Sequence, residues 1–138
     1  MSEETKSAGL LLRVVAKTID FILVAAAAEI IPKAGFFAGL TYLFISDGLF
    51  DGNSLGKKLT GLKVISTVSN NPCSIKESIL RNFTLCTGML LSKIPLIGWV
   101  LMVLIMAFES IILLGSKERL RLGDELAKTA VIEKKQSN

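Results

Sequence analysis

Three charged residues stand inside the first long apolar segment of the chain, LLRVVAKTIDFILVAAAAEI, which covers residues 11–30. They are Arg13, Lys17 and Asp20. On a helix, residues seven positions apart differ by only about 20° around the axis, so Arg13 and Asp20 share a face with Lys17 between them. Charges inside a membrane helix line ion or proton pathways, or pair with one another. The spacing therefore predicts a single polar stripe with one of these two roles.

Asp20 is the member of the stripe whose depth needs an explanation. Counted from an inner boundary near Leu10 at about 1.5 Å per residue, Arg13 lies roughly 5 Å deep and Asp20 about 15 Å deep, near the midplane. Arg13 and Lys17 are long enough to reach the inner headgroups. Asp20 is not, and an unpaired carboxylate there is costly. We expect Asp20 either to contact an ion or proton or to belong to a structural ion pair.

A further carboxylate, Glu109, falls in the last apolar segment of the sequence. It lies about five residues from the inner end of that segment, at a depth similar to that of Arg13 and Lys17. A pair across two helices is therefore geometrically feasible. We predict an internal charge network in which Arg13 or Lys17 meets Asp20 and Glu109.

The elements that carry these charges are long apolar blocks, and 51% of the 138 residues are hydrophobic. About 20 helical residues cross a hydrocarbon core of roughly 30 Å. The blocks predict an all-α, polytopic membrane domain over residues 10–133. Its third span is expected to be short or broken, because Gly88 stands in its middle and Pro95 ends it. The four predicted spans are 10–31, 32–50, 79–94 and 96–114.

The distribution of Lys and Arg decides between three and four crossings. Cytoplasmic segments of membrane proteins are enriched in these residues. With four crossings, only Lys33 and Lys93 of the 16 Lys and Arg lie outside. With 79–94 lying on the inner surface instead, the cations divide almost evenly. We predict four crossings in a plasma or bacterial inner membrane, with both termini cytoplasmic. The predicted cytoplasmic parts are the N-terminal tail 1–9, the loop 51–78 and the tail motif 115–133.

The inner loop contains DGLFDGNSLGKKLTGLKVIS, residues 47–66, in which glycines and Asp-Gly predict turns. Its spacing does not match a phosphate-binding loop, because no Ser or Thr directly follows the Gly-Lys pair. We expect Lys57 and Lys58 to contact anionic lipid headgroups, at about 1 kcal/mol each.

Two short β-branched runs lie on the same predicted face, residues 62–65 and residues 129–132. They are expected to pair as a two-stranded ribbon that covers the inner ends of the helices, or else to dock separately as loops. The final residues 134–138 lack an apolar anchor and are expected to be disordered.

Composition excludes several kinds of site. The chain has no histidine, so a histidine metal site, a Ser-His-Asp triad and a Cys-His pair are all excluded. Cys73 and Cys86 match no metal-ligand spacing and are expected to be unpaired. Asp20, Asp47 and Asp51 could in principle ligate a divalent cation, but Asp20 and Asp47 are predicted at different depths and nothing in the sequence forces them together. We expect no enzyme activity, cofactor or metal, and no nucleic-acid partner, because topology already explains the net charge of +4.

Together these motifs resemble the RDD family of small membrane proteins. The resemblance rests on Arg13 at the mouth of the first span, Asp20 in its middle, DGNSLGKKLTGLKV in the loop, the segment 74–81 and RLRLGDELAKTAV near the end. It covers the chain from about Leu10 to Glu133. The family name denotes one arginine and two aspartates, and the resemblance implies that Arg13, Asp20 and Asp124 hold these positions.

The resemblance implies two to four spans, and ion transport, including cation/proton antiport, is proposed for some members of the family. The chain departs from the family pattern at Gly123, where many relatives have histidine, and at Glu125, where a basic residue is frequent. A role that depends on that histidine is therefore not expected here.

Two functions remain open. In the first, Asp20 alternates between proton and cation in a transporter or transporter subunit, which with four spans needs a second copy or another membrane protein. The alanines at 25–28 offer a face for close helix approach, although alanine is also common in membrane helices. In the second, the chain is a non-catalytic adaptor or assembly module. Its buried charges then fix the bundle, and its basic face binds anionic lipid or a protein.

Overall fold

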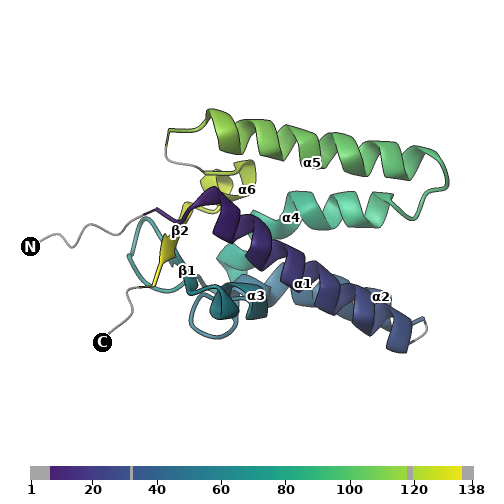
Figure 1. Cartoon of the computed structure of the whole chain (residues 1–138), viewed down its shortest axis with the longest axis horizontal. Helices are drawn as coiled ribbons and strands as arrows, with labels where there is room; N and C mark the ends of the chain where they lie inside the picture. The colour runs from purple at the N-terminus through teal and green to yellow at the C-terminus, as the bar shows by residue number, and fades with distance from the viewer. Residues whose placement is uncertain (1–6, 32, 118–119, 135–138) are drawn as a thin grey trace, which may run out of the picture.

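The computed structural model describes residues 7–31, 33–117 and 120–134. Four main helices extend from one end of the molecule, where the shorter elements gather (Figure 1). The main helices are α1 (Leu10–Ile30), α2 (Gly35–Ile45), α4 (Ile75–Leu91) and α5 (Ile97–Gly115). The shorter elements, which we call the cap, are η1 (Ser46–Gly48), α3 (Leu55–Leu59), β1 (Leu62–Ser66), α6 (Leu122–Leu126) and β2 (Thr129–Glu133).

Neighbouring main helices in the chain pack side by side, α1 against α2, α2 against α4, and α4 against α5. The turns that join α1 to α2 and α4 to α5 lie at the end away from the cap, and they hold the exposed Lys33 and Lys93 (Figure 1). At the cap end, Ser7 forms a β-bridge with Ile132 beside the ribbon. The start of α1 and the last strand therefore meet at the same end of the molecule.

The predicted ribbon is present. Strands β1 and β2 pair antiparallel, and Val64 lies opposite Val131 at the centre of the register. Both valines are buried, together with Leu62, Ala8 and Ala16, in one apolar cluster beneath the ribbon. Because Ala16 belongs to α1, this cluster fixes the ribbon to the inner end of that helix.

The cap is built from two copies of one short motif. Helix α3 and strand β1 share a pattern with α6 and β2, in which Leu-Gly-x-x-Leu is followed by a valine at the centre of the strand. In both copies the turn into the strand has a positive φ, 70° at Gly61 and 51° at Lys128. Each motif follows a pair of main helices. The chain therefore consists of two similar halves, α1-α2-α3-β1 and α4-α5-α6-β2, joined through the ribbon.

The structure confirms a helical chain but does not confirm four spans. Among the described residues, only Ile97–Gly115 is both long and apolar enough to cross a membrane by length and composition. Helix α1 has 21 residues but carries four charged side chains. Helix α2 has 11 residues, about 16 Å of helix, so the predicted span 32–50 is not one continuous helix.

The third predicted span was expected to be short or broken; it is not broken, and at 17 residues it is shorter than the roughly 20 that cross a hydrocarbon core. Helix α4 runs for 17 residues through Gly88 without interruption, and it begins at Ile75, before the predicted position 79. The earlier start has a local cause. Ser74 Oγ accepts a hydrogen bond from Glu77 N (3.3 Å), and Ser74 N donates to Glu77 Oε2 (2.8 Å), which forms a capping box.

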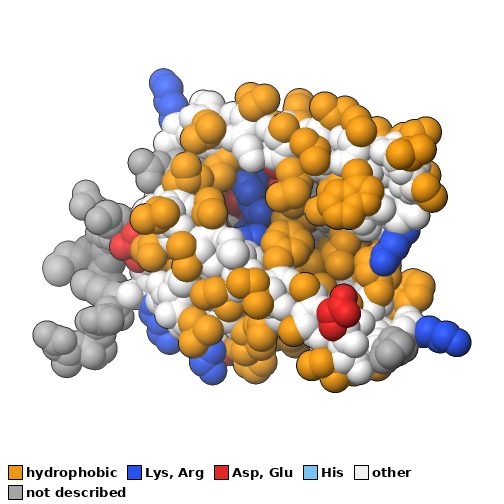
Figure 2. Space-filling view, turned by 45° about the vertical axis from the view of Figure 1, so that its right-hand side comes forward, with side chains coloured by type: hydrophobic (Ala, Val, Ile, Leu, Met, Phe, Trp, Pro, Cys, Tyr) orange, Lys and Arg blue, Asp and Glu red, His pale blue; other side chains and the backbone are white. Residues whose placement is uncertain are grey.

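The outer surface of the helices is largely apolar. Trp99, Val103 and Ile111 of α5 each leave more than half of their surface exposed, and Figure 2 shows hydrophobic side chains over most of this face. An exposed apolar surface of this extent is unusual for a soluble monomer and suits contact with lipid.

Candidate functional site

Asp20 is completely buried, and the protein supplies partners for both of its carboxylate oxygens. Ser54 Oγ donates to Oδ2 at 2.6 Å, while Gly56 N and Tyr42 Oη donate to Oδ1 at 2.9 Å. Helix α3 approaches this closely because residue 56 is glycine: a Cβ there would collide with the carbonyl oxygen of Ala16. Asp20 therefore fastens the first cap motif to α1.

A second buried carboxylate, Asp47, lies in the turn after α2 and joins three elements. It forms an ion pair with Lys57 of α3, and its Oδ2 lies 3.4 Å from Arg81 Nε of α4. Asn82 Nδ2 also donates to Asp47 Oδ2 at 3.1 Å. The backbone N–H of Asp47 donates to Ser78 Oγ at 3.1 Å. Asp47 thus ties the end of α2 to both α3 and α4.

Asp124, in the second cap motif, is the third buried carboxylate and forms ion pairs with three arginines. Its closest partner is Arg81 Nη2, 2.6 Å from Oδ1, followed by Arg121 Nη2 at 3.5 Å and Arg13 Nη1 at 3.7 Å. Arg13 Nη2 also donates to the carbonyl oxygen of Val131 at 3.1 Å. Because Arg81 contacts Asp47 as well, its guanidinium joins the two halves of the molecule.

Lys17 and Glu109 have weaker polar contacts. Lys17 Nζ donates to the neutral Asn82 Oδ1 at 3.3 Å and lies 5.9 Å from the centre of the Phe21 ring. Within the described residues, no carboxylate lies within ion-pair distance of Lys17. Glu109 Oε2 is 4.0 Å from Arg121 Nη1, at the limit of an ion pair.

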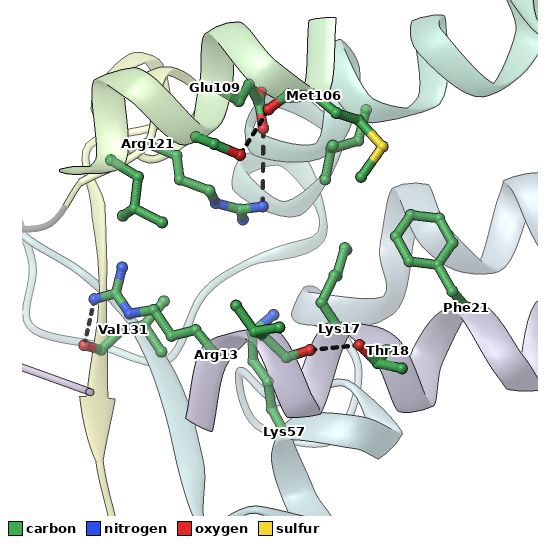
Figure 3. Close-up of a pocket in the computed structure, with 13 residues that line it drawn as sticks. Arg13, Lys17, Thr18, Phe21, Lys57, Met106, Glu109, Arg121 and Val131 are labelled. Atoms are coloured by element: carbon green, nitrogen blue, oxygen red, sulfur yellow. Dashed lines mark hydrogen bonds and ion pairs between the residues drawn. The ribbon is translucent and has the colours of Figure 1, made fainter. Parts of the chain in front are cut away.

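These two side chains face a cavity of about 210 Å³ between α1 and α5. Figure 3 shows Arg13 and Lys17 on the α1 side and Glu109 and Arg121 on the opposite side. In Figure 2 the basic groups lie in a hollow of the apolar face. The lining contains four cationic side chains and one carboxylate. Asp47 pairs with Lys57, and Asp124 pairs with Arg13 and Arg121, so the excess positive charge of the lining lies on Lys17. The charged lining residues are Arg13, Lys17, Lys57, Arg121 and Glu109.

Burial and neighbouring charges shift the pKa values of the cap residues in opposite ways. Burial alone would raise the pKa of Asp47, but Lys57 and Arg81 hold it well below the usual 3.8. Arg81 likewise keeps the pKa of Asp124 low against the effect of burial. For Lys57, loss of hydration outweighs the attraction of Asp47 and lowers the pKa to about 8. The two carboxylates are therefore ionised at neutral pH.

The charged residues predicted to form one network are buried or line the cavity, but they contact other partners than those we expected. We expected Arg13 or Lys17 to meet Asp20 and Glu109, but Arg13 contacts Asp124 and Asp20 takes hydroxyl and backbone donors. Arg13, Lys17 and Glu109 do line one cavity. Of the three residues assigned to the family motif, Arg13 and Asp124 meet, whereas Asp20 makes separate contacts. The reason is that the cap folds against α1 and reaches Asp20 with its own donors.

The expectation for the two loop lysines is wrong for one of them. Lys57 is 5% exposed and faces Asp47, so it is not an outward headgroup contact. Lys58 is exposed, with Nζ 5.3 Å from the centre of the Phe50 ring. Helix periodicity explains the difference, because adjacent residues of α3 point about 100° apart.

Sequence reasoning missed the residues that hold the network together. Arg81 entered only as the last residue of the segment 74–81, and Asn82, Ser54 and Arg121 were not considered for a site. One signal was available. The repeated Leu-Gly-x-x-Leu motif places Lys57 and Asp124 at equivalent positions, directly after Gly56 and Gly123, and would have marked both as facing inward.

The model of the RDD family matches residues 7–128 of the chain. The match covers α1 through α6 and therefore includes every charged residue of the network described above. No curated protein and no solved structure gives a match.

Proposed function

This chain belongs to the RDD family of small membrane proteins, and we propose that it is a non-catalytic membrane module. In this proposal the helices anchor a cytoplasmic cap of fixed shape, and the basic groups at its boundary with the helices engage anionic lipid or another membrane protein. The positions of Lys33 and Lys93, at the end away from the cap, support this orientation, because cytoplasmic segments carry most of the cations.

The observation that carries the proposal is the environment of Asp20. Its carboxylate accepts three hydrogen bonds from the protein and has no exposed surface. A carboxylate that exchanges a proton for a cation needs access to solvent and ligands that can leave. The donors of Asp20 instead belong to α2 and to the Ser54–Gly56 segment, and releasing them would detach α3. This arrangement favours a structural role.

The rest of the network supports the same function. Arg81 is fully buried and bridges Asp47 and Asp124, which belong to different halves of the chain. Breaking such a pair leaves an uncompensated charge in a dry environment. The cap is therefore held rigidly against the helices, as an assembly module requires.

One observation favours ion transport as a second candidate. Glu109 lines the cavity, and its Oε1 has no hydrogen-bond partner within the described part of the chain. In a transporter it would be Glu109, and not Asp20, that meets the ion. Lys17 in the same lining opposes this candidate, because no described carboxylate lies at ion-pair distance from it and its charge repels a metal cation.

The test is a flux assay in liposomes, with Na⁺, K⁺ or Li⁺ added across an imposed pH gradient. We expect no cation-dependent proton flux from wild type or from Glu109→Gln. We expect Asp20→Asn to lower thermal stability and to produce less monodisperse protein. Glu29→Gln is the matched control, because Glu29 is an exposed carboxylate on the same helix. Flux in wild type that Asp20→Asn abolishes without loss of stability would refute the module, and flux lost only in Glu109→Gln would favour transport.

A further inference from the structure

The cavity occurs where the two halves of the molecule differ. In the two equivalent halves, α1 corresponds to α4 and α2 corresponds to α5. The contact between α2 and α4 should therefore have a counterpart between α5 and α1. Helices α2 and α4 pack extensively, whereas α5 and α1 have no comparable packing. The closed interface is apolar, with Leu40, Leu43 and Cys86 buried together. The open one holds the cavity.

The difference has a chemical cause in the side chains at the open interface. Arg13 and Lys17 of α1 and Glu109 of α5 face each other across the cavity, together with Arg121 (Figure 3). Closing the helices would strip water from these groups, and no described carboxylate is placed to neutralise Lys17. The interface therefore stays open beside Lys17, and a bound anion would supply the counter-charge of this side chain.

The surroundings of the cavity select an anion that carries hydrocarbon. The lining between the charged groups is apolar and includes Phe21, Leu85 and Leu113. At its edges, Val14 and Met106 are 54% and 41% exposed on the face that would meet lipid. A cavity of about 210 Å³ is smaller than the roughly 300–1,000 Å³ of sites that enclose a whole small ligand. It suits a headgroup whose chains remain outside.

We propose that this cavity binds the phosphate of an anionic membrane phospholipid, which enters sideways between α1 and α5. Lys17 contacts the phosphate, and Arg13 and Arg121, which also pair with Asp124, line the site beside it. The acyl chains lie along the exposed apolar edges of the two helices. The inference names the partner of the module proposed above and rests on that function. It assigns the ligand to one built site, whereas general attraction of lysines to a charged membrane surface would have no fixed position.

Native mass spectrometry of the full chain in detergent tests the site directly, with phosphatidylglycerol and phosphatidylcholine of the same acyl composition. We expect phosphatidylglycerol to bind about tenfold more tightly, the effect of one charge-assisted contact. Lys17→Met should remove this preference and Lys17→Arg should retain it. Lys58→Met removes the same charge from an exposed position of the cap and should leave the preference unchanged.

Three results would overturn the proposal. Equal affinity of wild type for the two lipids would remove the anionic headgroup as ligand, and equal losses in Lys17→Met and Lys58→Met would assign the preference to the surface. Inorganic phosphate that displaces the lipid at the same concentration would make a free anion the ligand.

A second experiment applies if Lys17→Met does not fold. Wild type is then crosslinked with a photoactivatable phosphatidylglycerol: crosslinks to α1 and α5 around Phe21 and Met106 support the site, and crosslinks elsewhere refute it. The flux assay is independent, so failure of the module and failure of the lipid site are distinguishable.

Discussion

At the scale of single residues, Asp20 takes two of its three hydrogen-bond donors from a segment more than 30 positions further along the chain. Ser54 Oγ and Gly56 N are these donors, and both belong to the start of α3; the third donor is Tyr42 Oη of α2. A carboxylate in an apolar helix would otherwise remain unpaired, at a high cost. The contact between Asp20 and the start of α3 therefore stabilises the buried carboxylate and also positions the cap.

Replacing Asp20 with Asn should destabilise the protein by about 1–3 kcal/mol, because an amide nitrogen would face at least one donor that now needs an acceptor. The measurement is the change in unfolding midpoint in detergent. Glu29→Gln should have almost no effect, since Glu29 is exposed on the same helix. A loss of stability in the control as large as that in Asp20→Asn would contradict a specific role for the three hydrogen bonds.

Arg81 should be more sensitive than any other residue of the network, because it is fully buried and contacts both Asp47 and Asp124. Arg81→Met leaves two buried carboxylates with fewer cations and should cost about 3–5 kcal/mol. Lys76→Met, an exposed change on the same helix, is the control. Denaturant or thermal unfolding measures both variants. A cost below about 1 kcal/mol for Arg81→Met would show that Arg81 does not hold the halves together.

The residue types of the site were predictable, but their partners were not. Periodicity places Arg13, Lys17 and Asp20 on one face, and the depth of Asp20 requires that its carboxylate have a partner. The sequence does not state which segment supplies that partner. We expected Glu109 in the network because it lies at a similar depth to Arg13 and Lys17. The cap was expected only at the inner ends of the helices, whereas it reaches Asp20 with its own donors.

At the scale of elements, the ribbon was predictable, because residues 62–65 and 129–132 have the same β-branched character and lie on one face of the predicted topology. The short helices that precede the strands were not. A helix of five residues has almost no periodicity to detect, and its stability comes from packing. Their shared Leu-Gly-x-x-Leu pattern was the detectable signal.

The equivalence of α3 and α6 leads to a matched prediction for two glycines. A Cβ at Gly56 would collide with the carbonyl oxygen of Ala16, and one at Gly123 would collide with that of Arg81. Gly56→Ala and Gly123→Ala should each push a short helix away from its main helix, at a cost of about 1–3 kcal/mol or more. Unfolding midpoints in detergent would measure this cost.

Gly115→Ala provides the control for these two variants, because no atom lies within 4 Å of a Cβ built at that position. It should be neutral or slightly stabilising, since alanine favours helix. A large loss for only one of Gly56→Ala and Gly123→Ala would mean that the two motifs do not dock in the same way. The equivalence of the halves would then be superficial.

At the scale of the whole molecule, the two halves share a plan but differ in charge where they meet. Asn82 of α4 and Lys17 of α1 contact each other from helices that occupy equivalent places in the two halves. The side chain of Asn82 is neutral, whereas that of Lys17 is cationic. The apolar α2–α4 contact closes and the charged α1–α5 contact does not. Composition and topology predicted a bundle, but the opening depends on which helices keep charges at their interface.

The ion network also makes the stability of the whole molecule depend on pH in a defined range. Asp47 and Asp124 have pKa values held below 3.8 by Lys57 and the arginines, against the effect of burial. As pH falls below about 4, the unfolded chain binds protons at these carboxylates before the folded chain does, so the free energy of unfolding decreases. Above that pH the full contribution is present. The unfolding midpoint in detergent should therefore fall steeply below about pH 4.

Asp124→Asn separates this effect from general acid sensitivity. The variant should be less stable than wild type at pH 7, because Arg81 loses a buried partner, but its midpoint should fall less between pH 5 and pH 3. Asp51→Asn removes an exposed carboxylate from the cap and should retain the slope of the wild type. If all three proteins lose stability in parallel, the acid response belongs to the surface charge of the whole chain. If only Asp124→Asn is flattened, the carboxylates that join the two halves determine the pH range in which the cap stays attached.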